Sequence, residues 1–259
     1  MNYKEENSII LEQFFKRGFF SSWAEPRKNK GRNVAGSLEI YLTTDCNLGC
    51  KYCYLNRHED QLYPKELRDD DLILKNLGVM IDFLIENNYT PKIDIFSGAG
   101  AESTLGINAM KLMYEKYAAT TIENRPAFIS IPTNFTFILD DELTKQVEDL
   151  KNKFMELDIG VGLSVSIDGK YMEGNRPFRN KKRVDTEMVM PEGKEDPRDD
   201  EYYDKVFAFA KKHRAGFHPM VYSRKIEDWK QNFLWFQEQF EKHGLSFDNI
   251  YLLEIRNAE

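Results

Sequence analysis

The chain has 259 residues, of which 41% are hydrophobic, 13% aromatic and 31% charged, a composition that excludes disordered and collagen-like proteins. Its formal charge of -7 disfavours nucleic acid and anionic membranes as partners. No apolar run approaches the ~18 residues that span a bilayer, and acidic residues stand near the amino terminus, where a signal peptide would be basic. We therefore expect a soluble, cytoplasmic protein.

Two regions follow one another along the sequence. Residues 1–36 predict a short amphipathic helix that ends at Gly18, followed by a connector rich in Pro, Lys, Arg and Gly. Residues 37–259 alternate β-rich runs with segments of helical period. Strands are predicted at Leu38–Thr44, Lys92–Ser97, Ala127–Thr133, Gly162–Ile167, Gly216–Tyr222 and Asn249–Ile255. The segments between them carry apolar stripes, for example Trp229, Phe233, Phe236 and Phe240, typical of helices packed on a sheet.

This alternation predicts an α/β fold, a partial (β/α)6 TIM-like barrel with parallel strands. In such barrels the chemistry takes place at the carboxyl ends of the strands. Polar residues follow the first four predicted strands, at Asp45 to Cys53, Gly98 to Glu102, Asn134 and Asp168. We therefore expect the functional site at this edge of the sheet.

Two segments depart from a compact barrel. The connection from Lys170 to about Asp200 is far longer than the usual loop of about 2–6 residues, and it predicts either a solvated flexible loop or a lid over the barrel mouth. The sequence also ends at Glu259, directly after the sixth predicted strand. We expect either that the amino-terminal segment covers this strand or that the chain is a fragment, truncated after strand six.

All three cysteines lie within eight residues, at Cys46, Cys50 and Cys53. An odd number of cysteines in one short loop excludes a disulfide framework and indicates the ligands of one metal centre. Zinc would require a fourth ligand, for which His58 is the nearest candidate. A 4Fe-4S cluster bound by three cysteines would leave one iron open to an exogenous ligand.

The spacing Cys46-x3-Cys50-x-Tyr52-Cys53 resembles the signature of radical S-adenosylmethionine (SAM) enzymes, including the aromatic Tyr52. The longer string CNLGCKYCY is similar to the subgroup with a SPASM or twitch extension, which includes peptide and protein maturases. The resemblance covers about Leu38 to Asn257. The extra cysteines that ligate auxiliary clusters in SPASM enzymes are not found in this sequence.

The loop after the second strand, FSGAGAE, is similar to the family pattern F-S-G-G-E-P, although Ser103 stands where proline is usual. By this resemblance Gly98, Gly100 and Glu102 contact the SAM amino group. Asn134 matches the family's T-N-G pattern, with Phe135 in place of glycine.

The end of the fourth strand, Ser164-Val165-Ser166-Ile167-Asp168-Gly169, is similar to the S-x-D-G segment of the SPASM group. In that group a serine and a downstream arginine bind the carboxylate of SAM. Strand alternation places Ser164, Ser166 and Asp168 on one face, which would line the barrel interior. Arg176 is the candidate carboxylate ligand, and Arg179 and Arg183 are the alternatives.

His218, in the fifth predicted strand, is either a satisfied core histidine or a group that lines the barrel interior.

The resemblance implies an oxidoreductase that binds a 4Fe-4S cluster and SAM. It would cleave SAM reductively to a 5′-deoxyadenosyl radical, which abstracts hydrogen from a peptide or protein side chain. An electron donor such as flavodoxin or ferredoxin is implied. The alternatives are a minimal radical SAM enzyme that acts on a small molecule and a non-catalytic metal-binding or interaction module.

Overall fold

The computed structural model describes residues 27–29, 32–34, 37–53, 69–95, 101–179, 195–221, 226–246 and 253–254. Several sequence predictions lie outside these ranges. They are the amino-terminal helix, His58, Gly98, Gly100 and Arg183.

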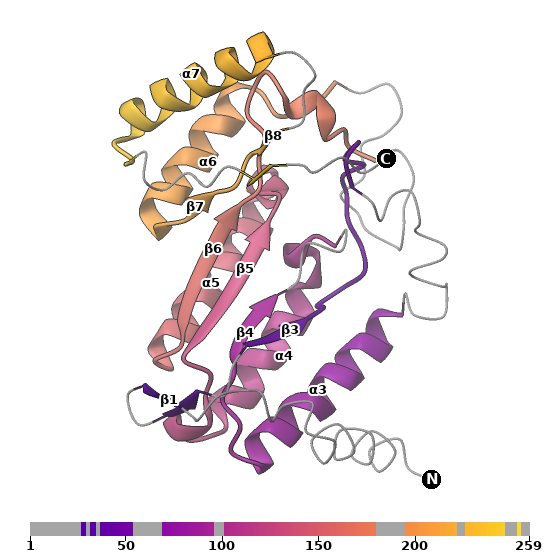
Figure 1. Cartoon of the computed structure of the whole chain (residues 1–259). Helices are drawn as coiled ribbons and strands as arrows, with labels where there is room; N and C mark the ends of the chain where they lie inside the picture. The colour runs from indigo at the N-terminus through magenta and orange to yellow at the C-terminus, as the bar shows by residue number, and fades with distance from the viewer. Residues whose placement is uncertain are drawn as a thin grey trace.

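A parallel sheet forms the centre of the described part of the chain (Figure 1). Its five strands are β3 (Ser37–Ile40), β4 (Lys92–Ile95), β5 (Phe128–Thr133), β6 (Gly160–Val165) and β7 (Gly216–Phe217), paired in this order. All four pairings are parallel. Because neighbouring strands are consecutive in the chain and parallel, their carboxyl ends meet at one edge of the sheet. The predicted α/β fold with parallel strands is confirmed.

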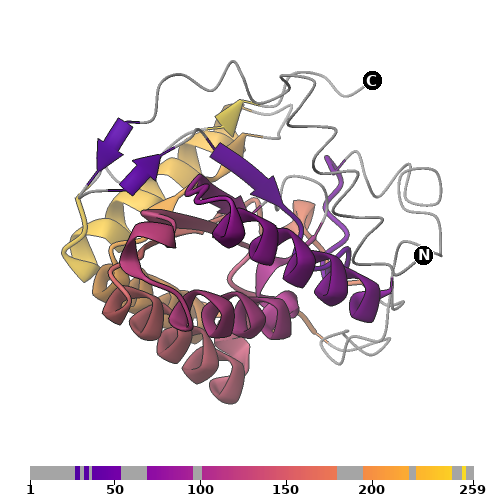
Figure 2. The ribbon, with the colours of Figure 1, turned by 90° about the horizontal axis from the view of Figure 1, so that it is seen from below.

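Helices connect the strands and cover the outside of the sheet, and in Figure 2 they follow one another in an arc around it. The α-helices are α3 (Asp70–Glu86), α4 (Ile107–Ala118), α5 (Asp141–Glu156), α6 (Asp200–His213) and α7 (Ile226–His243). Short 3-10 helices lie at η2 (Ser103–Gly106), η3 (Ile122–Asn124), η4 (Thr136–Leu139) and η5 (Glu173–Asn175). In the described part of the chain, no helix has the length and apolar character needed to cross a membrane.

Aspartates begin three of these helices. The side chains of Asp69, Asp140 and Asp199 accept hydrogen bonds from backbone N–H groups in the first turns of α3, α5 and α6. Each carboxylate thus satisfies helix donors that have no partner within the helix.

Aromatic side chains pack α6 and α7 against β7. Phe207 stacks on Phe217 with ring centroids 4.9 Å apart and meets Phe240 edge-on at 5.8 Å. Of the aromatic stripe predicted on α7, Phe236 and Phe240 are buried, whereas Trp229 and Phe233 are half-buried and stack on each other. The stripe therefore contributes to the core.

The last predicted strands differ from the structure. The fifth breaks at His218 and Pro219 into β7 and β8 (Met220–Val221), because proline has no N–H for a central ladder. The sixth is described only as β9 (Leu253–Glu254), which pairs with β8 in a separate two-stranded parallel sheet.

The predicted connector before the barrel also contains regular structure. It includes an antiparallel pair of strands, β1 (Arg27–Asn29) and β2 (Arg32–Val34).

Candidate functional site

The cysteine loop, residues 45–53, follows β3 at the carboxyl edge of the sheet. Its three cysteines form no disulfide bonds and are each partly exposed. The N–H of Cys53 donates to the carbonyl of Cys50 at 3.0 Å, so these two cysteines lie on one tight turn. Leu48, only 1% exposed, anchors the loop from within.

Backbone hydrogen bonds hold the cysteine loop against residues 175–179. The N–H of Gly49 donates to Pro177 O at 2.7 Å, and that of Lys51 donates to Asn175 O at 2.8 Å. The N–H of Arg179 donates to Asn47 O at 2.9 Å. Leu48 and Phe178 therefore form an antiparallel bridge. We call this arrangement the loop ladder.

The loop ladder corrects one expectation. The connection after the fourth strand is not solvated throughout, because Lys170 and Tyr171 are exposed whereas Glu173 and Arg176 are only 5% and 4% exposed. Residues 175–179 form one side of the candidate site instead. Residues 180–194 lie outside the described ranges.

The Glu102 cluster joins the loop after β4 to the end of β5. The buried carboxylate of Glu102 accepts hydrogen bonds at Oε1 from Thr104 N (3.0 Å), Thr104 Oγ1 (2.7 Å) and Thr133 Oγ1 (2.5 Å). At Oε2 it accepts one from Asn134 N (2.6 Å). The N–H of Glu102 donates to Asp45 O at 2.7 Å. Glu102 thus ties three strand ends together.

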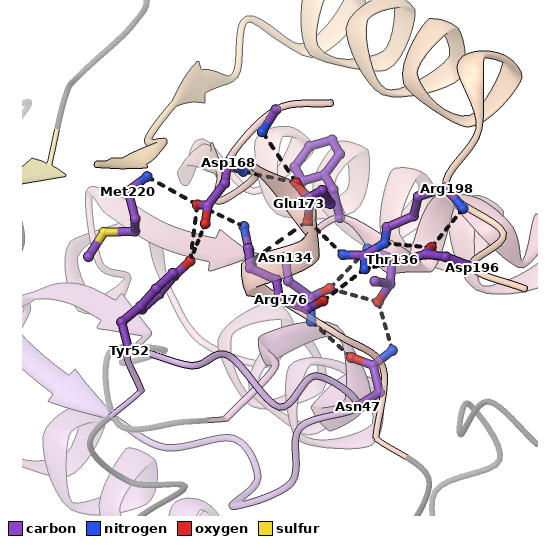
Figure 3. A network of polar contacts seen from close by, with 12 residues as sticks. Asn47, Tyr52, Asn134, Thr136, Asp168, Glu173, Arg176, Asp196, Arg198 and Met220 are labelled. Atoms are coloured by element: carbon purple, nitrogen blue, oxygen red, sulfur yellow. Dashed lines mark hydrogen bonds and ion pairs between the residues drawn. The ribbon is translucent and has the colours of Figure 1, made fainter. Parts of the chain in front are cut away.

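Asn134 connects this cluster to the cysteine loop. Its Nδ2 donates to Asn47 Oδ1 at 2.9 Å, and Asn47 Nδ2 donates to Thr136 Oγ1 at 2.8 Å (Figure 3). Phe135, which replaces the family's glycine, has a φ of 62°. Its fully buried ring lies 5.0 Å from that of Phe137, and this packing holds an aromatic residue in a left-handed conformation that usually favours glycine.

The Asp168 cluster lies at the end of β6. Tyr52 donates its hydroxyl proton to the buried Asp168 carboxylate, with O–O distances of 2.9 and 3.0 Å, and Met220 N donates to the same group at 3.1 Å (Figure 3). Arg176 Nη1 lies 3.8 Å from Asp168 Oδ1. The structure therefore brings Tyr52 to Asp168, which lies 116 positions later in the sequence, while Arg176 lies near Asp168 in both sequence and space.

A second ion-pair layer supports this cluster. Glu173 accepts hydrogen bonds from Asp168 N (3.0 Å) and Gly169 N (3.3 Å), and from Arg198 Nη1 (2.6 Å). Arg198 also donates to the carbonyl of Arg176 at 2.8 Å and forms a two-point ion pair with Asp196. Its guanidinium lies 4.8 Å from the centre of the Phe178 ring.

Burial controls the charge states near the cysteines. It raises the pKa of Asp168 to about 7, although the charge of Arg176 acts in the opposite direction. Burial also raises the pKa of Cys50 and that of Tyr52, and Arg176 opposes both effects. The pKa of Arg176 itself is raised by its anionic neighbours despite burial, so this group remains a cation.

Two further predicted residues lie along β6. Ser164 Oγ is 3.4 Å from His218 Nε2, and burial lowers the pKa of His218. Ser166 is half-buried, and its N–H donates to Thr133 O at 2.8 Å. Val165 and Ile167, which alternate with these residues, are fully buried. Ser164 and Ser166 are thus more exposed than their neighbours, whereas Asp168, which was predicted to share their face, is fully buried.

Sequence reasoning missed three residues of the site. Asn47 lies inside the quoted cysteine motif but was assigned no role, and Glu173 and Arg198 lie in the long connection. A cation at Arg198 within an acidic stretch was the available signal, because a lone charge of opposite sign indicates an ion-pair partner.

The three cysteines supply the thiol ligands that a 4Fe-4S cluster requires. Within the described ranges, no three His, Cys, Asp or Glu side chains converge closely enough to bind one metal ion. A 4Fe-4S cluster spans a larger space and is bound by thiolates. Three free thiols on one loop, one of them beside a buried guanidinium, supply suitable ligands.

Comparisons with known proteins give partial sequence matches. No family model matches the chain. An uncharacterized protein of Methanocaldococcus jannaschii is 31% identical over 148 residues, which are 56% of this chain and 43% of the relative. The sporulation killing factor maturation protein SkfB of Bacillus subtilis is 33% identical over 81 residues, which are 27% of this chain and 19% of SkfB.

Solved structures share the fold. Native anSMEcpe with bound AdoMet matches with a TM-score of 0.51 and 15% identity, covering 85% of this chain and 52% of that chain. A polyhistidine-tagged form of anSMEcpe with bound AdoMet matches with a TM-score of 0.54 and 18% identity, covering 86% and 50%. The chain therefore spans about half, or less, of the proteins that it matches. These matches to solved structures show the fold of the chain.

Proposed function

We propose that the protein is a radical SAM enzyme that binds a 4Fe-4S cluster through Cys46, Cys50 and Cys53. The observation that carries this proposal is the cysteine loop, held by the loop ladder at the carboxyl edge of a parallel sheet with its thiols partly exposed. With a 4Fe-4S cluster and SAM bound there, one electron passed through the cluster would cleave SAM to methionine and a 5′-deoxyadenosyl radical, which would abstract hydrogen from the substrate. The chain's own residues bind the metal centre, orient SAM and keep water away.

SAM binding is proposed at the strand ends beside the loop. Ser166 remains the candidate for the SAM carboxylate, because it is half-buried and lies directly after the carboxyl end of β6. Gly98 and Gly100 remain candidates from the resemblance. Glu102 is a weaker candidate, since protein donors already occupy both of its carboxylate oxygens. Asn134 orients the loop through Asn47.

For the substrate, we propose a peptide or protein side chain. The sequence resemblance to the maturase subgroup supports this choice, as does the likeness to SkfB, whose name describes maturation of the sporulation killing factor. Ser164 in β6 and His218, directly after β7, are polar groups 3.4 Å apart and are suited to contact a substrate. A flavodoxin or ferredoxin is the proposed electron donor.

Anaerobic reconstitution with iron and sulfide tests the proposal. We expect about four irons per chain, and 5′-deoxyadenosine after addition of SAM and dithionite. Cys46→Ala, Cys50→Ala and Cys53→Ala should each lose the cluster and this product. Lys51→Ala, an exposed change in the same loop, should retain both. Stoichiometric zinc in the purified protein, or full iron content in the cysteine variants, would contradict the assignment.

A mass-spectrometric search for altered products then addresses the substrate. Candidate peptides and small metabolites are incubated separately with the reconstituted protein and SAM. Products formed only from small molecules would exclude the peptide substrate while leaving SAM cleavage in place.

A further inference from the structure

The register of the loop ladder places Arg176 directly opposite Cys50. Leu48 and Phe178 form the bridge, with flanking hydrogen bonds from Gly49 to Pro177 O and from Arg179 to Asn47 O. They are therefore a non-hydrogen-bonded pair. Cys50 and Arg176 stand two residues further along the same register and form the next non-hydrogen-bonded pair. The hydrogen bond from Lys51 N to Asn175 O lies on the far side of this pair. Side chains approach most closely at these pairs, where Cα atoms are about 4.5 Å apart.

Backbone hydrogen bonds to residues outside the loop ladder hold Arg176 in place. Pro177 has no N–H, so the step beside Arg176 has only one of its two ladder bonds. Arg176 N donates to Glu173 O at 2.8 Å, and its carbonyl accepts a hydrogen bond from Arg198 at 2.8 Å. These contacts hold the guanidinium at the cysteine loop.

The Arg176 guanidinium has N–H donors that lack acceptors. Its side chain is 5% exposed, and its Nε and Nη1 atoms have no hydrogen-bond acceptor. The nearest carboxylates, Asp168 and Glu173, lie 3.8 Å away, beyond hydrogen-bond distance. Both carboxylates already accept hydrogen bonds from Tyr52, Met220 N, Arg198 and backbone N–H groups. Buried donors without acceptors are costly, which points to an anionic partner on the cysteine side.

Cys50 is the group that the register places opposite this guanidinium, because the two residues form a non-hydrogen-bonded pair in which side chains approach closely. Burial raises the pKa of the Cys50 thiol, and the charge of Arg176 acts in the opposite direction. A thiolate that binds iron carries negative charge, which grows when the metal centre takes up an electron. A buried cation beside it stabilises the reduced form more than the oxidised form.

We propose that Arg176 is a positioning residue for the metal centre, which donates a hydrogen bond to the Cys50 sulfur and raises the reduction potential of the bound cluster. This inference rests on the proposed function of the cysteine loop. It differs from the sequence prediction that Arg176 binds the SAM carboxylate, because an effect on the cluster must be present without SAM.

The test uses the reconstituted full chain without SAM, titrated with dithionite and monitored by electron paramagnetic resonance. Arg176→Met, which removes the charge, should shift the midpoint potential to more negative values. Arg176→Lys, which keeps the charge without the planar fork, should give an intermediate value. The matched control is Lys51→Met, which removes the neighbouring charge from an exposed position and should leave the potential unchanged.

The outcomes distinguish a failure of the inference about Arg176 from a failure of the proposed function. If wild type and Arg176→Met both hold about four irons and share one midpoint potential, the inference is wrong and the proposed function stands. A loss of SAM affinity without a change in potential would also overturn it. A wild-type chain that binds no iron would refute both.

Arg176→Met exposes two buried carboxylates to an uncharged neighbour and can impair folding, so the wild type supplies a second measurement. Resonance Raman spectra of its cluster in H₂O and D₂O should differ in the Fe–S(Cys) stretching modes, because the proton donated to Cys50 exchanges. Identical spectra would overturn the inference.

Discussion

Replacing Glu102 by Gln tests whether this residue joins the strand ends, as its contacts indicate. The glutamine oxygen can still accept the three hydrogen bonds that reach Oε1, but its NH₂ group then faces the N–H of Asn134, which lies 2.6 Å from Oε2. The glutamine NH₂ group and the N–H of Asn134, both donors, would then face each other at a residue that is only 1% exposed. Loss of one bond to a charged acceptor, with a buried N–H left unpaired, should lower the free energy of unfolding by about 2–3 kcal/mol.

The assay is thermal and urea denaturation of the metal-free chain, followed by circular dichroism. For a chain of this size the expected loss corresponds to a fall in Tm of roughly 5–10 °C. Glu115→Gln, an exposed change in α4, is the control and should alter stability by less than about 0.5 kcal/mol.

A Glu102→Gln variant with wild-type stability would refute this reasoning. If the same variant also lost affinity for SAM after reconstitution, Glu102 would be a SAM ligand, as the family resemblance implies. Loss of stability with unchanged SAM affinity would assign Glu102 to the structure alone.

Three further predictions concern the rest of the fold. Gly169→Ala should lower the free energy of unfolding by about 2–4 kcal/mol in urea denaturation, because Gly169 has a φ of 96° and a Cβ there would lie 2.5 Å from Asn232 Oδ1. Gly174→Ala is the control and should be nearly neutral, because a Cβ there would meet open space. Phe207→Ala should cost about 3–5 kcal/mol in the same assay, since its fully buried ring contacts several aromatic rings. Burial lowers the pKa of His213 below its usual 6.5, although Glu148 lies 2.7 Å away. The folded protein therefore favours the neutral ring, whose contribution to stability is present above pH 6.5 and is lost as the pH falls below that value. Between about pH 7.5 and 5.5, the His213→Gln variant should therefore lose less stability than the wild type.

The sheet and its helices could be predicted from the sequence because the pattern that defines them is local. The stripe of Val147, Leu150 and Phe154 repeats with helical period, and all three side chains are buried. Strand ends were predicted less well, since pairing with the neighbouring strand decides where a strand stops. The first strand ends at Ile40 rather than Thr44, and Pro219 divides the fifth.

The site was predictable only in part. The cysteines, Tyr52 and Asp168 stand in recognisable motifs, and the structure brings Tyr52 and Asp168 into contact. Glu173 and Arg198, the partners of the Asp168 cluster, could not be predicted, because their contact joins residues 25 positions apart in the chain. The roles of Gly98, Gly100, Asn134, Ser164 and Ser166 toward SAM stay predictions.

The loop ladder has a consequence for how the site is assembled during synthesis. Its two sides, residues 47–51 and 175–179, are separated by three helix–strand units, α3–β4, α4–β5 and α5–β6. A ribosome that has completed only β3 and the cysteines has made three thiols without the backbone that fixes their turn. The described arrangement can form only after Arg179 has left the exit tunnel, so metal uptake before that point would meet an unorganised loop. The order of synthesis thus favours insertion of the metal centre late, into a barrel that is already largely folded.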